Sequence, residues 1–337
     1  MKILVVGLGS MGRRRLRNLT HLGGAQLAGL EPGEARRAEV AGEFGIPAFA
    51  TLDDALAEFG PEALVISTPP DRHTEYAIEA ARRGLHFFTE ASVVPGDTDE
   101  LIEVARAAGV VGAPSCTMRF HPAVQKLRER IAAGAIGRPL LVTHHVGQYL
   151  PDWHPWEDYR TYYVANRETG AAREIVPFEL NWMAYLFGPV ASVAGMRAKL
   201  SSLEVDIDDV YSALTAFESG VHCNLVIEVV SRPAIRRARI VGEEGTLIWD
   251  WNERRVEEWS AAGGGEWVHH PDPPPVEGPG GSWVAENMYI EEMRGYLGAI
   301  GGDRDAYPFT LEEDRDLLRA LGEVERSSDE GRRVELG

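Results

Sequence analysis

An apolar run that leads directly into a glycine-rich turn constrains the fold of this chain more than any other feature. Residues 3–6 read Ile-Leu-Val-Val, with the length and composition of a buried strand. The G-x-G-x-x-G turn that follows consists of Gly7, Leu8, Gly9, Ser10, Met11 and Gly12. Its first glycine permits a tight bend, its second lets backbone approach a pyrophosphate, and its third lets the next helix pack closely. Because the helix N-terminus then faces the phosphates, the motif predicts a dinucleotide-binding unit.

A carboxylate follows at the spacing expected for ribose binding. The apolar run at residues 27–30 ends in Glu31, about 20 residues after the glycines. A carboxylate at this point binds ribose hydroxyls and repels a 2′-phosphate, so Glu31 favours NAD over NADP. Arg36 and Arg37 follow closely and could partly reverse this preference. The alternative to nucleotide binding is an ordinary tight turn between a strand and a helix.

Short apolar strands continue to alternate with helices over about the first 120 residues. The further runs predicted to be strands are 63–66, 85–88 and 110–112. The helices expected beside them are 13–22, 74–83 and 98–108. This alternation predicts an α/β fold with a Rossmann-type, doubly wound parallel sheet, in which loops at the carboxyl ends of the strands hold ligands.

Composition excludes several classes of partner. The length of 337 residues suggests about two domains, and 44% hydrophobic content suffices for two cores. Acidic residues outnumber basic ones 52 to 34, and the resulting charge of −18 disfavours nucleic acid and anionic membranes as partners. The chain passes from Met1 almost directly into a core strand and has no span of membrane length, so we expect a cytoplasmic protein. Cys116 and Cys223 form no metal or redox motif, and we expect reduced core thiols.

Several further motifs, in the same order, resemble those of the Gfo/Idh/MocA family, which includes glucose-fructose oxidoreductase and inositol dehydrogenase. After the glycine turn and the acidic strand end, the pattern Ser-Thr-Pro-Pro-x-x-His is formed by Ser67, Thr68, Pro69, Pro70 and His73. Residues 84–90 then read Gly-Leu-His-Phe-Phe-Thr-Glu. Residues 118–122, 137–140 and 307–336 are also similar to family segments, so the resemblance covers nearly the whole chain.

The resemblance implies an oxidoreductase that uses NAD(P) on a carbohydrate-like small molecule. The cofactor-binding residues that it adds to the glycine turn and Glu31 are Ser67, Thr68, Pro69, Pro70, His73, Glu90, Ala91 and Arg119. Glu90 is expected to position the cofactor rather than to transfer protons. For His73 the alternative role is a contact that caps the following helix.

The resemblance also implies a second, α+β domain with a large open sheet, through which family members commonly form dimers or tetramers. Strand-like runs occur at 140–145, 190–196, 211–217, 221–230, 237–241 and 246–250. Because these runs are mostly consecutive, we expect a mostly antiparallel sheet and a homodimer or homotetramer formed through it. The predicted domains are 1–120, 121–310 and a C-terminal helix and tail at 311–337. Residues 263–265 and 271–281 predict an exposed loop.

Both of the family's usual proton carriers are missing. Oxidation of an alcohol needs a base within hydrogen-bond reach of the hydroxyl. In the family this base is the lysine of a Glu-Lys-Pro motif, but here the segment reads Glu90-Ala91-Ser92. The family also has an aspartate followed four residues later by a histidine, and ungapped matching places Glu174 and Phe178 there.

Four side chains are candidates for the missing proton transfer. Glu174 could act as a general acid or base, or could simply be a carboxylate that favours a helix N-terminus. His154, Tyr162 and Tyr163 belong to an aromatic and polar stretch at residues 148–163, and their side chains can carry protons. The alternative for this stretch is a loop that packs its aromatic rings against its own domain.

The candidate substrate-binding residues are Trp153, Arg173 and His121, with Arg119 as a further possibility. Trp153 would stack on a sugar ring. Arg173 would clamp a carboxylate or phosphate, or would instead pair with Glu174. His144 and His145 are adjacent on a predicted strand and should point to opposite faces. No ligand spacing supports a metal site.

The sequence therefore predicts an NAD-preferring oxidoreductase that acts on a sugar, polyol or sugar-derived acid with a non-standard proton carrier. One alternative is a catalytically silent protein that binds the cofactor as a sensor or regulator. Another is a redox-assisted lyase or glycosidase in which the cofactor is recycled within each turnover.

Overall fold

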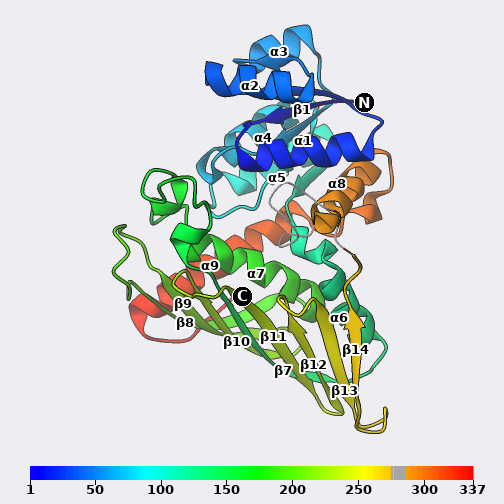
Figure 1. Ribbon diagram of the computed structural model, residues 1–337, viewed down its shortest axis with the longest axis vertical. Coiled ribbons are helices and arrows are strands. Elements are labelled where there is room, and N and C mark those ends of the chain that lie inside the picture. Colours follow the sequence, from blue (N-terminus) through cyan, green and yellow to red (C-terminus); the bar gives the residue numbers. More distant parts are fainter. Residues whose placement is uncertain (275, 277–285, 337) are drawn as a thin grey trace. The chain divides into compact units, whose positions relative to one another are not determined.

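The computed structural model describes residues 1–274, 276 and 286–336 (Figure 1). The chain divides into two compact units. Unit 1 comprises Met1–Thr117 and Pro275–Arg315, and unit 2 comprises Met118–Pro274 and Asp316–Gly337. This division differs from the predicted boundaries, since residues 275–310 were expected in the second domain. The physical reason is helix α8 (Asn287–Ile300), which packs against α1 (Ser10–Leu22) of unit 1.

Unit 1 contains a six-stranded parallel sheet, which confirms the predicted α/β class. In spatial order the strands are β3 (Ala48–Phe49), β2 (Gln26–Leu30), β1 (Lys2–Val6), β4 (Ala63–Ile66), β5 (His86–Thr89) and β6 (Gly112–Pro114). The last strand begins at the end of the apolar run predicted for it. Val110 is not part of β6, because its amide donates a hydrogen bond to the Ala105 carbonyl at the end of α5.

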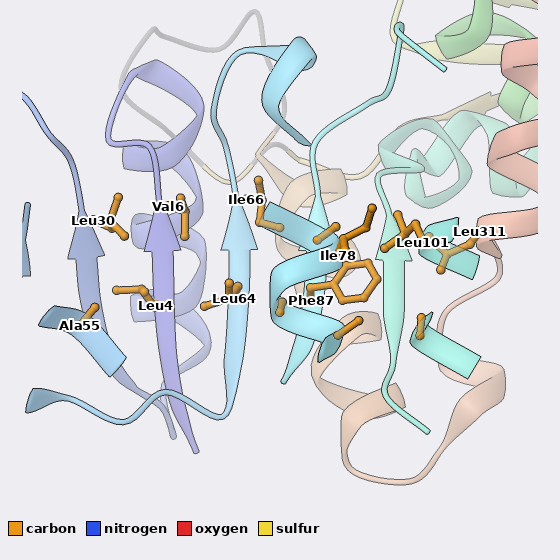
Figure 2. Close-up of a cluster of buried hydrophobic side chains, with 14 of the residues drawn as sticks. Leu4, Val6, Leu30, Ala55, Leu64, Ile66, Ile78, Phe87, Leu101 and Leu311 are labelled. Atoms are coloured by element: carbon orange, nitrogen blue, oxygen red, sulfur yellow. The ribbon is translucent and has the colours of Figure 1, made fainter. Parts of the chain in front are cut away.

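The core of unit 1 lies between this sheet and its helices. Besides α1 and α8 these are α2 (Glu34–Phe44), α3 (Leu52–Glu58), α4 (His73–Arg82) and α5 (Thr98–Ala108), with short 3₁₀ turns at Pro70–Arg72, Thr117–Phe120 and Arg304–Ala306. Figure 2 shows strand residues such as Leu64 and Phe87 meeting helix residues such as Ile78 and Leu101. These fully or almost fully buried side chains fix the strands, and with them the loops at the strands' carboxyl ends.

Unit 2 contains a nine-stranded sheet in the order β14-β13-β12-β11-β7-β10-β9-β8-β15. The strands are β7 (Pro139–Gly147), β8 (Val190–Ala198), β9 (Val210–Phe217), β10 (His222–Glu228), β11 (Ile235–Gly242), β12 (Gly245–Asp250), β13 (Arg255–Ser260), β14 (Trp267–Pro271) and β15 (Val334–Glu335). Only β7 and β10 pair in parallel, and the other neighbours are antiparallel, as predicted. The six strands expected from the sequence are all present.

Three helices accompany the sheet of unit 2. They are α6 (Pro122–Ala132), α7 (Ala172–Phe187) and the part of α9 (Leu311–Glu330) that follows residue 315, with 3₁₀ turns at Leu150–Asp152 and Tyr163–Ala165. Helix α7 packs against β9 and β10, which buries Val176, Leu180 and Met183 (Figure 1). Residues 263–265 form the predicted exposed turn, whereas 275 and 277–281 of the predicted loop lie outside the described residues.

Both cysteines are buried, reduced thiols, as expected. In the part of the chain that the structure describes, no helix combines the length and apolar character needed to cross a membrane.

Candidate active site

The glycine turn of unit 1 has the backbone geometry that its three glycines predict. Gly7 has φ +86°, and a Cβ added there would lie 2.7 Å from the Ser67 carbonyl oxygen. A Cβ on Gly12 would lie 1.9 Å from the Gly7 oxygen, so the strand and helix can approach only without a side chain. Gly9, by contrast, faces open space and caps α1 without a side-chain hydrogen bond. The first amides of α1 are therefore free of side-chain obstruction and can donate hydrogen bonds to a phosphate. The residues present fit a dinucleotide.

Glu31 is largely buried directly after β2. Its side chain is 8% exposed and accepts hydrogen bonds from the Gly33 amide at 3.0 Å and the Leu8 amide at 3.3 Å. Arg36 approaches the same carboxylate at 3.4 Å, whereas Arg37 donates to the backbone oxygen of Glu31. Two backbone amides thus hold the carboxylate beside the glycine turn.

The loop after β4 and the residue after β5 are linked through side chains. The Ser67 hydroxyl donates to Glu90 Oε1 at 3.0 Å. His73 Nε2 lies 2.9 Å from the Thr68 carbonyl oxygen and donates to it, so His73 holds the loop rather than capping the helix. Burial lowers the pKa of His73, which keeps the imidazole neutral.

A buried arginine holds Glu90. Arg15 of α1 is fully buried and binds both oxygens of Glu90, at 2.7 and 2.8 Å. Arg15 also lies 2.8 Å from Glu292 of α8, which in turn accepts hydrogen bonds from the Ser115 and Thr117 hydroxyls. The Glu90 carboxylate is therefore committed to an ion pair, in agreement with a positioning role. Neither Arg15 nor Glu292 is predicted as a site residue from the sequence; the available signal was an arginine next to the apolar Leu16 of the first helix.

The four predicted proton carriers lie together in unit 2. The Tyr163 hydroxyl donates to Glu174 Oε1 at 3.3 Å. The Tyr162 ring contacts the Tyr163 ring at 5.7 Å and stacks on His154 at 5.3 Å, between ring centroids. Gly170 makes this arrangement possible, because a Cβ there would lie 2.2 Å from Val164 Cα. The loop can thus fold back against the start of α7.

The electrostatics of this cluster single out Glu174. Burial raises the pKa of its carboxyl group to about 8, opposed by the hydrogen bond from Tyr163. Burial also raises the pKa of Tyr162 to about 12, and its hydroxyl makes no hydrogen bond to the described residues. His154 lies 3.5 Å from Glu157 and stacks on Trp156. A carboxyl group with a pKa of about 8 can exchange its proton near neutral pH.

The predicted substrate-binding residues have internal partners. Trp153 donates its indole N–H to the Gln148 carbonyl at 3.1 Å. Arg173 binds Glu325 of α9 at 2.8 Å. Their substrate-binding roles stay predictions.

His121 and Arg119 are likewise built into unit 2. His121 caps α6 by accepting the Ala123 amide at 3.1 Å, and burial lowers its pKa to about 3. Arg119 is 2% exposed and donates to the Asn181 side chain at 2.9 Å. Both have structural roles, and neither ligand-binding assignment has support beyond the sequence.

His144 and His145 point to opposite faces of β7, as predicted. His144 is fully buried and lies 2.8 Å from Glu179 of α7, whereas the half-buried His145 lies 3.1 Å from Glu228 of β10. Among the described residues, no group of three or more His, Cys, Asp or Glu side chains is arranged to hold a metal ion.

The strand order, the glycine turn and the carboxylate at the end of β2 define a Rossmann dinucleotide-binding protein with an added α+β unit. Two family models match the chain: the oxidoreductase family with an NAD-binding Rossmann fold over residues 1–115, and the GFO/IDH/MocA C-terminal domain over residues 124–248. The chain belongs to the Gfo/Idh/MocA family of oxidoreductases.

Individual relatives agree with this assignment. The scyllo-inositol 2-dehydrogenase (NAD(+)) of Bacillus subtilis is 31% identical over 42% of this chain and 42% of its own length. The UDP-N-acetylglucosamine 3-dehydrogenase of Acidithiobacillus ferrooxidans is 25% identical over 95% of both chains. The matches to the first two curated relatives span only 44% and 42% of those proteins.

Solved structures share the fold. An oxidoreductase from Agrobacterium radiobacter, crystallised with NAD+, L-tartaric acid and magnesium, superimposes with a TM-score of 0.87. The match covers 99% of this chain and 98% of that one, at 14% sequence identity.

Proposed function

We propose that the protein is an NAD-dependent oxidoreductase that acts on a CH–OH group of a sugar, polyol or sugar-derived acid. The observation that carries the proposal is the coexistence of a complete cofactor-binding turn in unit 1 with a carboxyl group in unit 2 whose pKa burial raises to about 8. Two relatives are named as dehydrogenases of scyllo-inositol and of UDP-N-acetylglucosamine, and these names support a carbohydrate-like substrate.

Apart from Arg119, the residues that would hold the cofactor belong to unit 1. The amides at the start of α1 would bind the pyrophosphate, and Glu31 would bind the adenosine ribose. Ser67 and Glu90, fixed by Arg15, would position the remaining part of the cofactor. When bound, NAD supplies a hydride acceptor at the nicotinamide C4.

Glu174 would carry the proton that accompanies the hydride. Below pH about 8 its carboxyl group is protonated and can donate a proton to a carbonyl oxygen that is being reduced. Above pH about 8 it is ionised and can accept the hydroxyl proton of an alcohol that is being oxidised. Tyr163 donates a hydrogen bond to the same carboxyl group and would orient it. His154 and Tyr162 complete the cluster as further candidate proton carriers.

The test is a titration of purified protein with stoichiometric NAD or NADH and a pool of sugars, polyols, their acids and keto forms. We expect a substrate-dependent change in nicotinamide absorbance that Glu174→Gln lowers by roughly 100-fold or more, the size of a lost general acid–base contribution. Glu168→Gln, on an exposed glutamate of the same segment, is the matched control and should behave like wild type.

Three other outcomes contradict the proposal in different ways. Tight cofactor binding without any change in absorbance or product indicates a sensor or regulatory protein. Product formation without net cofactor reduction indicates a redox-assisted lyase or glycosidase. Equal loss in the Glu174 variant and its control shows that Glu174 is not the proton carrier.

We also propose a cytoplasmic location and a homodimer or homotetramer formed through the sheet of unit 2. Met196 and Leu214, on the same face of neighbouring strands β8 and β9, are 66% and 62% exposed and support such an interface. Light scattering of the wild type and of Leu214→Glu tests the assembly, and a monomeric wild type would contradict it.

A further inference from the structure

A buried charged network connects helix α7 with the sheet of unit 2. Glu179 of α7 is fully buried, and its Oε2 accepts hydrogen bonds from His144 at 2.8 Å and from the Trp182 indole at 2.7 Å. Its Oε1 lies 2.7 Å from Nη2 of Arg236, which belongs to β11. The network thus contains one carboxyl group and two basic side chains.

Glu179 is the carboxyl group that both basic side chains of the network share. The imidazole of His144 has acceptors at both nitrogens, Glu179 at Nε2 and the Arg237 carbonyl at Nδ1, 3.1 Å away. Glu179 is ionised, because Arg236 and His144 outweigh its burial and hold the pKa of the carboxyl group to about 2. Its Oε2 is already bonded to His144 and Trp182, so only its Oε1 faces the Arg236 guanidinium.

Arg236 is the member of the network that a ligand can reach. Its side chain is 20% exposed, whereas those of His144 and Glu179 are fully buried. Its Nε is buried and makes no hydrogen bond to the described residues, and Glu179 Oε1 makes none either. The close contact with Glu179 is thus an ion pair without hydrogen-bond alignment, which leaves guanidinium donors available for another acceptor.

The surroundings of Arg236 have the character of a binding site. Its guanidinium lies 5.7 Å from the Phe178 ring centroid and 5.0 Å from that of Trp251. These rings hold the cation in place and lower the local dielectric, which strengthens a contact with an anion.

Helix α7 carries both Phe178, whose ring Arg236 contacts, and the candidate proton carrier Glu174. Phe178 and Glu174 are four residues apart, so they share one face of α7, about 6 Å apart along its axis. Both side chains are partly exposed, whereas Val176, Pro177 and Glu179 between and beside them are buried. Arg236 therefore contacts, through the Phe178 ring, the face of α7 on which Glu174 lies one turn earlier.

We propose that Arg236 forms a carboxylate-binding subsite, so that the substrate is a sugar-derived hydroxy acid whose carboxylate binds Arg236 while Glu174 exchanges the hydroxyl proton. This inference rests on the proposed function for the identity of the reacting group. A carboxylate suits this site, because its two oxygens can accept hydrogen bonds from the planar guanidinium of Arg236. The aromatic rings beside Arg236 would pack against the carbon chain of the acid.

The test compares ligands that share a carbon skeleton and differ in charge. Binding of D-glucuronate, D-gluconate and D-galactarate is measured by calorimetry in the presence of NAD, beside D-glucose, sorbitol, galactitol and glucose 6-phosphate. The variants are Arg236→Gln, Arg236→Lys and the control Arg237→Gln. Arg237 is the next residue of β11, with a side chain that is 55% exposed.

We expect the acids to bind more tightly than the neutral ligands. Arg236→Gln should weaken binding of the acids by about 10- to 100-fold, the range for a lost charge-assisted contact. The neutral ligands should bind this variant as they bind wild type. Arg236→Lys should recover part of the affinity, and Arg237→Gln should change nothing. An unchanged circular dichroism spectrum and melting temperature show that each variant is folded.

The inference is overturned if the acids bind no better than their neutral counterparts, or if Arg236→Gln weakens both alike. Preference for glucose 6-phosphate over all acids would assign the subsite to a phosphate instead and would also overturn it. Because binding is measured without turnover, the subsite can stand where hydride transfer fails. Conversely, turnover of neutral sugars alone would support the proposed function and refute the subsite.

Discussion

Replacement of Glu174 by glutamine should change how the stability of the protein depends on pH. The carboxyl group has an ordinary pKa of 4.5 in the unfolded chain, and burial raises it to about 8 in the folded protein. Between these values the folded chain binds a proton that the unfolded chain has lost. The folded state is therefore penalised progressively as the pH rises from about 4.5 to about 8, and the full penalty persists above that.

The size of this stability penalty follows from the difference between the two pKa values of Glu174. At about 1.4 kcal/mol per pH unit, the penalty is at most about 5 kcal/mol. Because the side chain is partly exposed, solvent reduces it, and we expect about 1–2 kcal/mol. Glutamine has the shape of the neutral carboxyl group and cannot ionise. The melting temperature of Glu174→Gln should therefore exceed that of wild type by an amount that grows by about 4 °C between about pH 5 and about pH 9.

The assay is thermal unfolding of both proteins by circular dichroism across this pH range, without cofactor. Only the difference between variant and wild type is used, since other groups also titrate. Glu168→Gln is the control, because Glu168 is exposed and lies six residues before Glu174. A difference between Glu174→Gln and wild type that stays constant with pH would refute the argument that burial keeps this carboxyl group neutral.

Three further predictions concern other parts of the chain. Glu292→Ala should lower stability by about 3–5 kcal/mol in chemical unfolding, since Arg15 would lose one of its two buried partners, whereas Glu291→Ala at an exposed neighbour should have little effect. Glu31→Ala should weaken NAD binding about tenfold in fluorescence titration and reduce the preference of the protein for NAD over NADP. An unchanged ratio of the two affinities would contradict ribose recognition by Glu31. Gly147→Ala should lower the melting temperature of the protein, because the new Cβ would lie 1.6 Å from Glu228 Oε1, and unaltered melting would show that Glu228 moves without cost.

The cluster of candidate proton carriers was only partly predictable. Glu174, His154, Tyr162 and Tyr163 were singled out by residue type and by resemblance, and the structure places them together. Their contacts depend on the close approach of Gly170 to the preceding loop.

The sequence by itself determined the cofactor half of the protein. Its strand, glycine turn, helix and carboxylate are neighbours along the chain, so local periodicity and spacing specify their geometry. Only the tertiary structure decided which charges meet. Arg15 binds Glu90, 75 residues away, and Arg236 approaches Glu179 and Phe178 because β11 pairs with β7 under α7. Such pairs depend on sheet order and helix packing, which arise from the burial of many apolar side chains at once and leave no local pattern to read.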